Sequence, residues 1–214
     1  MANNKKGVIF DLDGVITDTA KYHFIAWKNL ASSIGITLDE EFNTSLKGVS
    51  RIDSLKRILE HGNKLNDYTE DEILSLAEKK NNEYKGLLES LTKNDILPGV
   101  ADFIDDLKNH GIKISLASAS KNAPFILKKL GLYEKFDYIA DPDKVKHGKP
   151  APDIFIEAAR GLSLPIEETV GIEDAVAGVA AMRACNMNSI GIGVDADITL
   201  QSTYELKYSL ILEF

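Results

Sequence analysis

Val8-Ile9-Phe10-Asp11-Leu12-Asp13-Gly14 is a short apolar run that ends in two aspartates, one residue apart, and a glycine. Its apolar part, which starts at Gly7, predicts a buried strand. Ligands of open α/β sheets bind at the carboxyl ends of the strands. Two carboxylates so close to a core repel each other unless a cation or a proton offsets them. The run therefore favours a Mg²⁺-assisted site in which one aspartate is a nucleophile, with a polar Asp-Gly turn as the alternative.

The composition is that of an ordinary globular protein, with 214 residues of which 44% are hydrophobic and 27% charged. A formal net charge of −8 argues against nucleic acid or an anionic membrane surface as a partner. Cys185 is the only cysteine in the sequence, which excludes an intramolecular disulfide. The sequence contains no run of about 18 apolar residues and no N-terminal stretch typical of a signal peptide. We therefore expect a cytoplasmic protein, and a monomer, because no apolar surface stripe suggests a partner.

The region between residues 17 and 93 shows only helical patterns. Apolar residues recur at helical spacing from Tyr22 to Ile34, and Gly35 ends that stretch. Further helices are expected over residues 39–46, 50–61 and 69–91, the last of which begins at a hydroxyl followed by acids. The adjacent charges Lys79-Lys80 are interpreted as a solvated helix face.

From residue 95 onward, strands and helices alternate. Strands are expected over residues 111–117, 138–140, 169–172 and 189–194, with helices between them, whereas residues 194–214 show little pattern. Such alternation implies right-handed βαβ units and a parallel sheet. We therefore expect an α/β core domain of residues 1–16 and 94–214, interrupted by an all-helical insertion of residues 17–93. An insertion directly after the first strand would lie over the strand ends, where a lid is useful.

Three later segments also place polar groups at strand ends. Ser118 precedes a helix whose backbone N–H groups can hold phosphate oxygens, although a serine there is also a common helix cap. Lys149 is either a cation that neutralises a carboxylate and a phosphate at once, or a surface lysine. Glu173 and Asp174 offer hard oxygen ligands for Mg²⁺, or else interact with the dipole of the helix that follows.

Taken in order, these segments resemble the haloacid dehalogenase-like superfamily of phosphotransferases. The resemblance covers the whole chain and implies a Rossmann-like parallel-sheet core with an inserted helical cap domain. Three stretches narrow it to the mutases of this superfamily that interconvert β-glucose 1-phosphate and glucose 6-phosphate, namely Thr17–Trp27, Leu46–Arg51 and Ser118–Asn122. The acidic motif departs from the family, because Ala175-Val176 replaces the usual Ser-Gln and so leaves fine specificity open.

The resemblance implies a role for each matching residue of the core. Asp11 would be the nucleophile that becomes an aspartyl phosphate, and Asp13 the general acid and base. The protein ligands of Mg²⁺ would be Asp11, the Asp13 carbonyl, Glu173 and Asp174. The phosphoryl group in transfer would be held by Ser118, Ala119 and Lys149, with assistance from Ser120, Lys121 and Asn122.

The resemblance further implies that the cap binds the rest of a sugar phosphate. Arg51 would grip the phosphate that is not being transferred, since its planar fork suits that anion. His23 would hydrogen-bond near Asp13 and couple substrate binding to cap closure, although a lone histidine is more often structural. The sugar would be contacted by Trp27, which alone would be interpreted as cap core, and by Lys47, Gly48, Val49 and Ser50.

The implied mechanism passes through β-glucose 1,6-bisphosphate, which must turn round while the closed cap excludes water. Three alternatives remain open at this point. A sugar-phosphate phosphatase would share the core, and a phosphonoacetaldehyde hydrolase-like enzyme would need a Schiff-base lysine in the cap, such as Lys47. A catalytically silent sugar-phosphate sensor would be expected to have a damaged set of core residues, whereas Asp11, Asp13, Lys149 and Asp174 are all present.

Overall fold

A six-stranded parallel sheet lies at the centre of one of the two units in the computed structural model, which describes residues 5–46 and 49–214. The strands are β1 (Gly7–Phe10), β2 (Lys113–Leu116), β3 (Tyr138–Ile139), β4 (Thr169–Glu173), β5 (Asn188–Ile192) and β6 (Ile198–Leu200). They lie in the order β3-β2-β1-β4-β5-β6, and every neighbouring pair is parallel. The expected α/β fold is thus confirmed. This is a doubly wound order whose direction reverses between β1 and β4, and ligands bind at the strand ends beside such a reversal.

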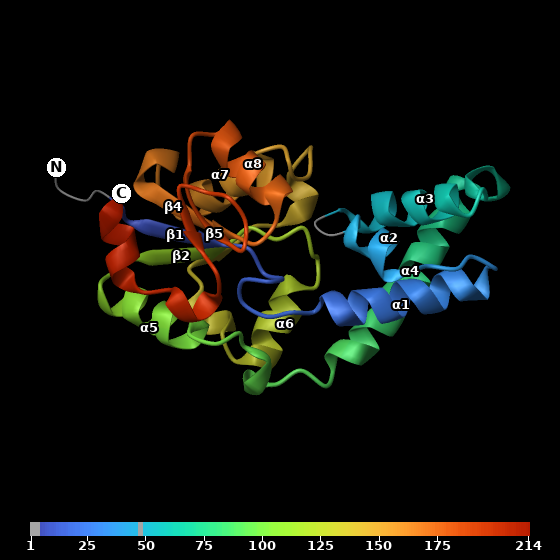
Figure 1. The fold of residues 1–214 in the computed structure, drawn as a ribbon, viewed down its shortest axis with the longest axis horizontal. Coiled ribbons are helices and arrows are strands. Elements are labelled where there is room, and N and C mark those ends of the chain that lie inside the picture. The colour runs from blue at the N-terminus through green and yellow to red at the C-terminus, as the bar shows by residue number, and fades with distance from the viewer. Residues whose placement is uncertain (1–4, 47–48) are drawn as a thin grey trace. The chain divides into compact units, whose positions relative to one another are not determined.

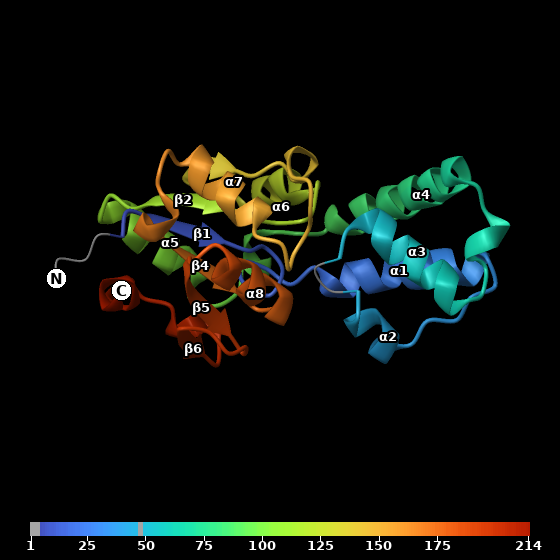
Figure 2. The same ribbon diagram turned by 90° about the horizontal axis from the view of Figure 1, so that it is seen from above.

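Helices cover both faces of the sheet (Figures 1 and 2). α7 (Asp153–Gly161) and α8 (Val176–Ala184) lie on one side, and α5 (Val100–Asn109) and α6 (Ala123–Leu130) lie on the other. Alternate residues of a strand point to opposite faces. Phe10 accordingly meets Phe103 of α5 edge to face, with 6.0 Å between ring centroids. Ile9 points the other way, into a buried cluster with Ala117, Ala140, Ile154, Phe155, Ala158, Ala159, Val179, Ala181, Met182 and Met187.

The chain divides into a core unit, Met1–Asp18 with Leu91–Phe214, and a helical unit, Thr19–Ser90. These boundaries differ by a few residues from the expected ones at 16/17 and 93/94. Thr17, which was expected in the insertion, hydrogen-bonds within the core unit, because its hydroxyl donates to the Asp95 carbonyl over 2.7 Å. The Leu97 amide likewise donates to the carbonyl of Ile16 over 2.9 Å.

The described residues of the helical unit form α1 (Ala20–Ser33), α2 (Glu40–Thr44), α3 (Arg51–His61) and α4 (Glu70–Leu88), each where helical spacing indicated a helix. α4 begins at a capping box, in which the Thr69 hydroxyl and the Glu72 carboxylate each accept the other residue's backbone N–H. The buried cluster of this unit consists of Trp27, Leu30, Ala31, Ile36, Leu38, Leu46, Leu55, Ile58, Leu59, Ile73 and Ala77. None of the helices in the described ranges is both long and apolar enough to cross a membrane.

The C-terminal residues form elements that the sequence did not indicate. β6 has only three residues, and the 3-10 helix η7 (Tyr208–Glu213) has six, too few for a clear periodicity. η7 is held by packing, because Leu210 and Ile211 are buried and the Tyr208 ring stacks on His110 with 3.8 Å between centroids. These residues therefore complete the core unit on the side of α5.

Ser115 of β2 is 0% exposed, and its buried hydroxyl has no hydrogen-bond partner among the described residues. We expect Ser115→Ala to raise the free energy of unfolding by about 1 kcal/mol, because burying an unpaired hydroxyl costs about 1–3 kcal/mol. Ser189→Ala is the matched control, since the equally buried Ser189 hydroxyl bonds with Asp197. That variant should be less stable than the parent in urea unfolding. A loss of stability in Ser115→Ala would contradict the prediction.

Candidate active site

Lys149 joins the ends of the two strands between which the sheet order reverses. Its Nζ donates to Oδ1 of Asp11, directly after β1, and to Oε2 of Glu173, the last residue of β4, over 2.6 Å in each case. The side chains of these three residues are 4%, 12% and 2% exposed, respectively. Lys149 is therefore a buried cation between two carboxylates and not a surface lysine.

The charged groups of this cluster shift each other's pKa values. Burial alone would lower the pKa of Lys149, but the nearby Asp11 and Glu173 carboxylates outweigh it and raise that pKa. Burial and the Asp11 charge raise the pKa of Glu173, and Lys149 opposes them. Lys149 is thus held as an ammonium ion, and one positive charge faces the acids that follow β1 and β4.

Two glycines leave room for the acidic side chains. A Cβ at Gly178 of α8 would lie 1.9 Å from Oε2 of Glu173, and one at Gly14 would lie 2.0 Å from Oδ2 of Asp174. Gly14 also has a φ of +79°, which disfavours any other residue. Gly14 was expected only as part of an Asp-Gly turn and Gly178 was not predicted at all, because the need for space appears only once strand end and helix are packed together.

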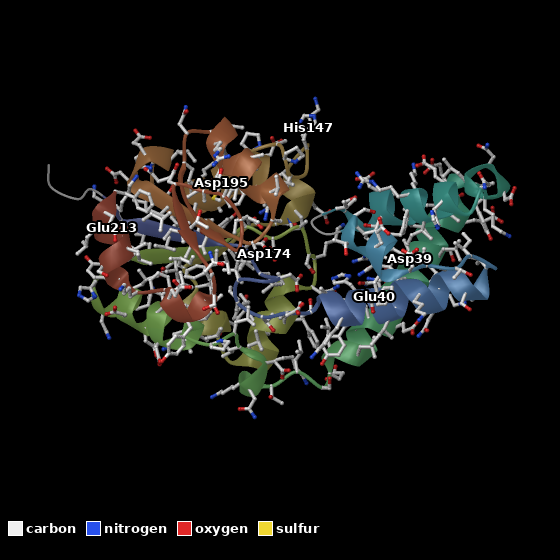
Figure 3. All side chains as sticks on the ribbon, in the orientation of Figure 1. Asp39, Glu40, His147, Asp174, Asp195 and Glu213 are labelled. Atoms are coloured by element: carbon white, nitrogen blue, oxygen red, sulfur yellow. The ribbon has the colours of Figure 1, made fainter. Side chains whose placement is uncertain are left out.

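The donor set fits a metal ion. Ligand oxygens of Asp11, Glu173 and Asp174 all lie within 4.8 Å of one another, and Asp174 is labelled in Figure 3. Three carboxylates against one ammonium leave excess negative charge, which a divalent cation with a preference for oxygen ligands would balance. Glu173 is already engaged, because its Oε1 accepts the N–H groups of Asp174 and Ala175. Asp11, Glu173 and Asp174 together form the group of carboxylates that could hold a metal ion.

Asp13 is the second aspartate of the run after β1, and it is half-buried. A tight turn holds it, since residues 13 and 17 pair as an isolated bridge and the Gly14 amide donates to the Thr17 carbonyl over 2.8 Å. Its assigned role as general acid and base remains a proposal.

The loop after β2 contains the residues that were expected to bind phosphate, and hydrogen bonds within the loop fix two of its hydroxyl groups. Ser118 is buried, and its hydroxyl accepts the Ser120 N–H over 3.1 Å instead of capping α6. The Ser120 hydroxyl accepts the Asn122 N–H over 3.3 Å, and Ala119 is exposed. Lys121 is exposed and pairs with Asp143 over 2.5 Å. Its side chain thus has a carboxylate partner that phosphate binding would have to displace.

A second cluster of polar and aromatic groups lies within the helical unit. Lys80 of α4 is 2% exposed, so the expectation of a solvated face was wrong for this residue. Its Nζ lies 4.5 Å from the ring centroids of both Trp27 and Tyr84 and hydrogen-bonds to Nδ1 of His23 over 2.7 Å. The side chain is buried because aromatic faces and an imidazole replace water around its charge. Trp27 is part of the core of the unit and is 4% exposed.

The environment of His23 keeps its ring neutral. Burial, the Lys80 ammonium and the Arg51 guanidinium together hold its pKa well below the ordinary value. An ammonium group can only donate, so Nδ1 must accept the hydrogen bond from Lys80. The proton of the neutral ring then lies on Nε2, which remains a hydrogen-bond donor.

Arg51 is the first residue of α3, and its Nη1 lies 3.3 Å from Oε2 of Glu78 on α4. Ser50 caps α3, because its hydroxyl accepts the Asp53 N–H, and it also donates to the Asp53 carboxylate. Val49 is half-buried, and its amide donates to Leu46. The predictions for Lys47 and Gly48 lie outside the described residues.

The model of the haloacid dehalogenase-like hydrolase family matches residues 5–186. This chain belongs to the haloacid dehalogenase-like hydrolase family. It is 45% identical to a β-phosphoglucomutase of Bacillus subtilis over 97% of this chain and 94% of that protein. It is also similar to the crystal structure of a β-phosphoglucomutase from Clostridium difficile, with a TM-score of 0.95, 49% identity, and coverage of 98% and 96% of the two chains.

Other haloacid dehalogenase-like proteins are similar at lower identity. The fructose-1-phosphate phosphatase YqaB of Escherichia coli is 32% identical over 87% of this chain and 95% of its own length. The likeness to both β-phosphoglucomutases runs through the helical unit as well as the core unit, since nearly the full chain is covered. Membership of the haloacid dehalogenase-like family, expected from the strand-end segments, is therefore confirmed.

Proposed function

We propose that this protein is a β-phosphoglucomutase, which interconverts β-D-glucose 1-phosphate and D-glucose 6-phosphate with Mg²⁺ as cofactor. The observation that carries the proposal is the similarity, at 45% and 49% identity over nearly the full chain, to two proteins of that name. The buried Asp11–Lys149–Glu173 cluster supports it, because phosphoryl transfer depends mainly on positioning and on neutralised charge. Small sugar phosphates are the proposed substrates, and cytoplasm is the proposed location.

Asp11 is the nucleophile in the proposed reaction. Its carboxylate attacks the 1-phosphate of β-glucose 1,6-bisphosphate, the bond from phosphorus to the sugar oxygen breaks, and Asp13 supplies the proton to that oxygen. The products are glucose 6-phosphate and an aspartyl phosphate. In the other half of the cycle, Asp13 takes the proton of the 6-hydroxyl of β-glucose 1-phosphate, which accepts the phosphoryl group and regenerates the bisphosphate.

Lys149 and the loop after β2 hold the phosphoryl group in this proposal. The Lys149 ammonium stays charged beside Asp11, so it offsets negative charge on both the nucleophile and the phosphate. Ser118 and the Ala119 backbone supply hydrogen bonds. Mg²⁺ bound by Asp11, Asp174 and the Asp13 carbonyl would neutralise further charge on the transferring group. Glu173 serves chiefly to orient Lys149, since its carboxylate oxygens already accept three hydrogen bonds.

The helical unit acts as the cap that binds the remainder of the sugar phosphate. Arg51 binds the phosphate that is not in transfer, and His23 offers its Nε2–H to an oxygen of the substrate. Lys80 fixes the tautomer of His23 that carries its proton on Nε2, because it donates a hydrogen bond to Nδ1, and it helps to keep the His23 ring neutral. Water must be excluded while the aspartyl phosphate exists, because otherwise the enzyme would act as a phosphatase.

Arg51→Ala tests the assignment of the second phosphate. We expect the mutase kcat/KM to fall on the order of 10²-fold, because charge-assisted bonds to an anion are lost. Hydrolysis of p-nitrophenyl phosphate, whose only phosphate is the one that is transferred, should change by less than about threefold. Arg57→Ala is the matched control on the same helix, since Arg57 donates to the Ser45 carbonyl. Equal losses on both substrates would refute the role of Arg51.

A further inference from the structure

Glu78 is the carboxylate that faces Arg51 within the helical unit. Oε2 of Glu78 on α4 lies 3.3 Å from Nη1 of Arg51 on α3, and the two side chains are 57% and 25% exposed, respectively. The pair therefore joins two helices at a surface where the carboxylate is the more accessible partner. A solvent-exposed pair of this kind is weak and easily exchanged for another anion.

Positive charge gathers around Arg51. Arg51 and Lys80 both lower the pKa of His23, so two cations lie close to the same imidazole. Glu78 precedes Lys80 on α4 by two residues and contributes a negative charge at the edge of this group. A carboxylate and a phosphate use the same donors of a guanidinium group. Glu78 thus occupies a donor of Arg51 that a phosphate would otherwise use.

We propose that Glu78 is a specificity-determining counter-ion, which competes for Arg51 with the substrate phosphate that is not being transferred and so weakens its binding. This inference rests on the proposed function, which assigns that phosphate to Arg51. Competition lowers the affinity for the sugar phosphate, and it also helps Arg51 to release the bisphosphate when that molecule turns round. Removing the charge of Glu78 should therefore tighten binding of any ligand whose phosphate binds to Arg51.

Glu78→Gln is the direct test. We expect the KM for β-glucose 1-phosphate to fall about two- to fivefold, the range that corresponds to an exposed ion pair. The KM for p-nitrophenyl phosphate should not change. The difference between variant and parent should shrink at high salt, because exposed charges are screened. An unchanged KM for the sugar phosphate would overturn the proposal.

Glu70→Gln is the matched control. Glu70 also lies on α4 and pairs with a cation of α3, Lys56, over 3.0 Å, and it is similarly exposed. We expect this variant to keep the parent KM, which separates competition at Arg51 from a general loss of surface charge. A fall of the KM in Glu70→Gln equal to that in Glu78→Gln would overturn the proposal as well.

Two further measurements distinguish failure of this inference from failure of the proposed function. In the Arg51→Ala background, Glu78→Gln should leave the KM unchanged, and a fall there would show that Glu78 does not act through Arg51. If the parent protein released free phosphate in place of converting the sugar phosphate, the proposed function would be wrong. Formation of glucose 6-phosphate together with an unchanged KM in Glu78→Gln would overturn this inference alone and leave the proposed function standing.

Discussion

Asp11→Asn should abolish both mutase turnover and formation of the aspartyl phosphate. An amide is a far poorer nucleophile than a carboxylate, and losing a nucleophile costs on the order of 10⁴-fold or more in kcat. Stability should not fall, because the substitution removes one negative charge from a buried cluster of three acids and Glu173 still pairs with Lys149. Coupled detection of glucose 6-phosphate measures turnover, and intact-protein mass measures the bound phosphoryl group.

Asp195→Asn provides the matched control for that substitution. The Asp195 side chain is 89% exposed and pairs with Arg183 over 2.9 Å. The Asp195→Asn variant should retain the turnover rate and the melting temperature of the parent protein. Full turnover in a verified Asp11→Asn protein would contradict the assignment of the nucleophile.

Lys149→Met should lower both stability and turnover. Two buried carboxylates then lack the cation between them, and breaking such a pair costs about 3–5 kcal/mol of unfolding free energy. Turnover should fall on the order of 10³-fold, as when a preorganised donor to a transition-state charge is removed. Urea unfolding and steady-state kinetics measure the two losses.

The stability deficit of Lys149→Met should grow with pH in metal-free buffer. Already in the parent, burial and Asp11 raise the pKa of Glu173 from 4.5 to about 8, and loss of Lys149 can only raise it further. A carboxyl group whose folded-state pKa is raised contributes stability at low pH, which is lost as the pH rises through that pKa. The deficit should therefore be smaller at about pH 5 than at about pH 8. Lys6→Met is the control, since the Lys6 side chain is 55% exposed and its pair with Glu168 should contribute about 1 kcal/mol at most.

The main elements of the fold were predictable from the sequence, because each carries a strong local signal. The apolar run before Asp11 and the capping box at Thr69 are examples, and both elements lie where they were expected. The order of the strands was not predictable, since it depends on pairing between distant residues. The structure adds that β1 and β4 are neighbours, which brings Asp11 and Glu173 to one ammonium group.

Residues of the site that depend on packing were missed for the same reason. Lys80 lies among charged residues in the sequence, and only the packing of α1 against α4 reveals that Trp27 and Tyr84 surround its ammonium group. Gly178 has no local signal either, because the atom that excludes a side chain there belongs to Glu173. Sequence patterns therefore indicated which polar residues lie at the strand ends better than the contacts that surround them.

One assay tests the proposed mutase most directly. The purified protein is incubated with Mg²⁺, β-glucose 1-phosphate and a trace of β-glucose 1,6-bisphosphate, and glucose 6-phosphate and free phosphate are measured together. We expect glucose 6-phosphate to form without release of free phosphate, and to depend on both the metal and the bisphosphate. Free phosphate as the main product would contradict the proposal and indicate a phosphatase, and the absence of both products would indicate a catalytically silent sugar-phosphate sensor.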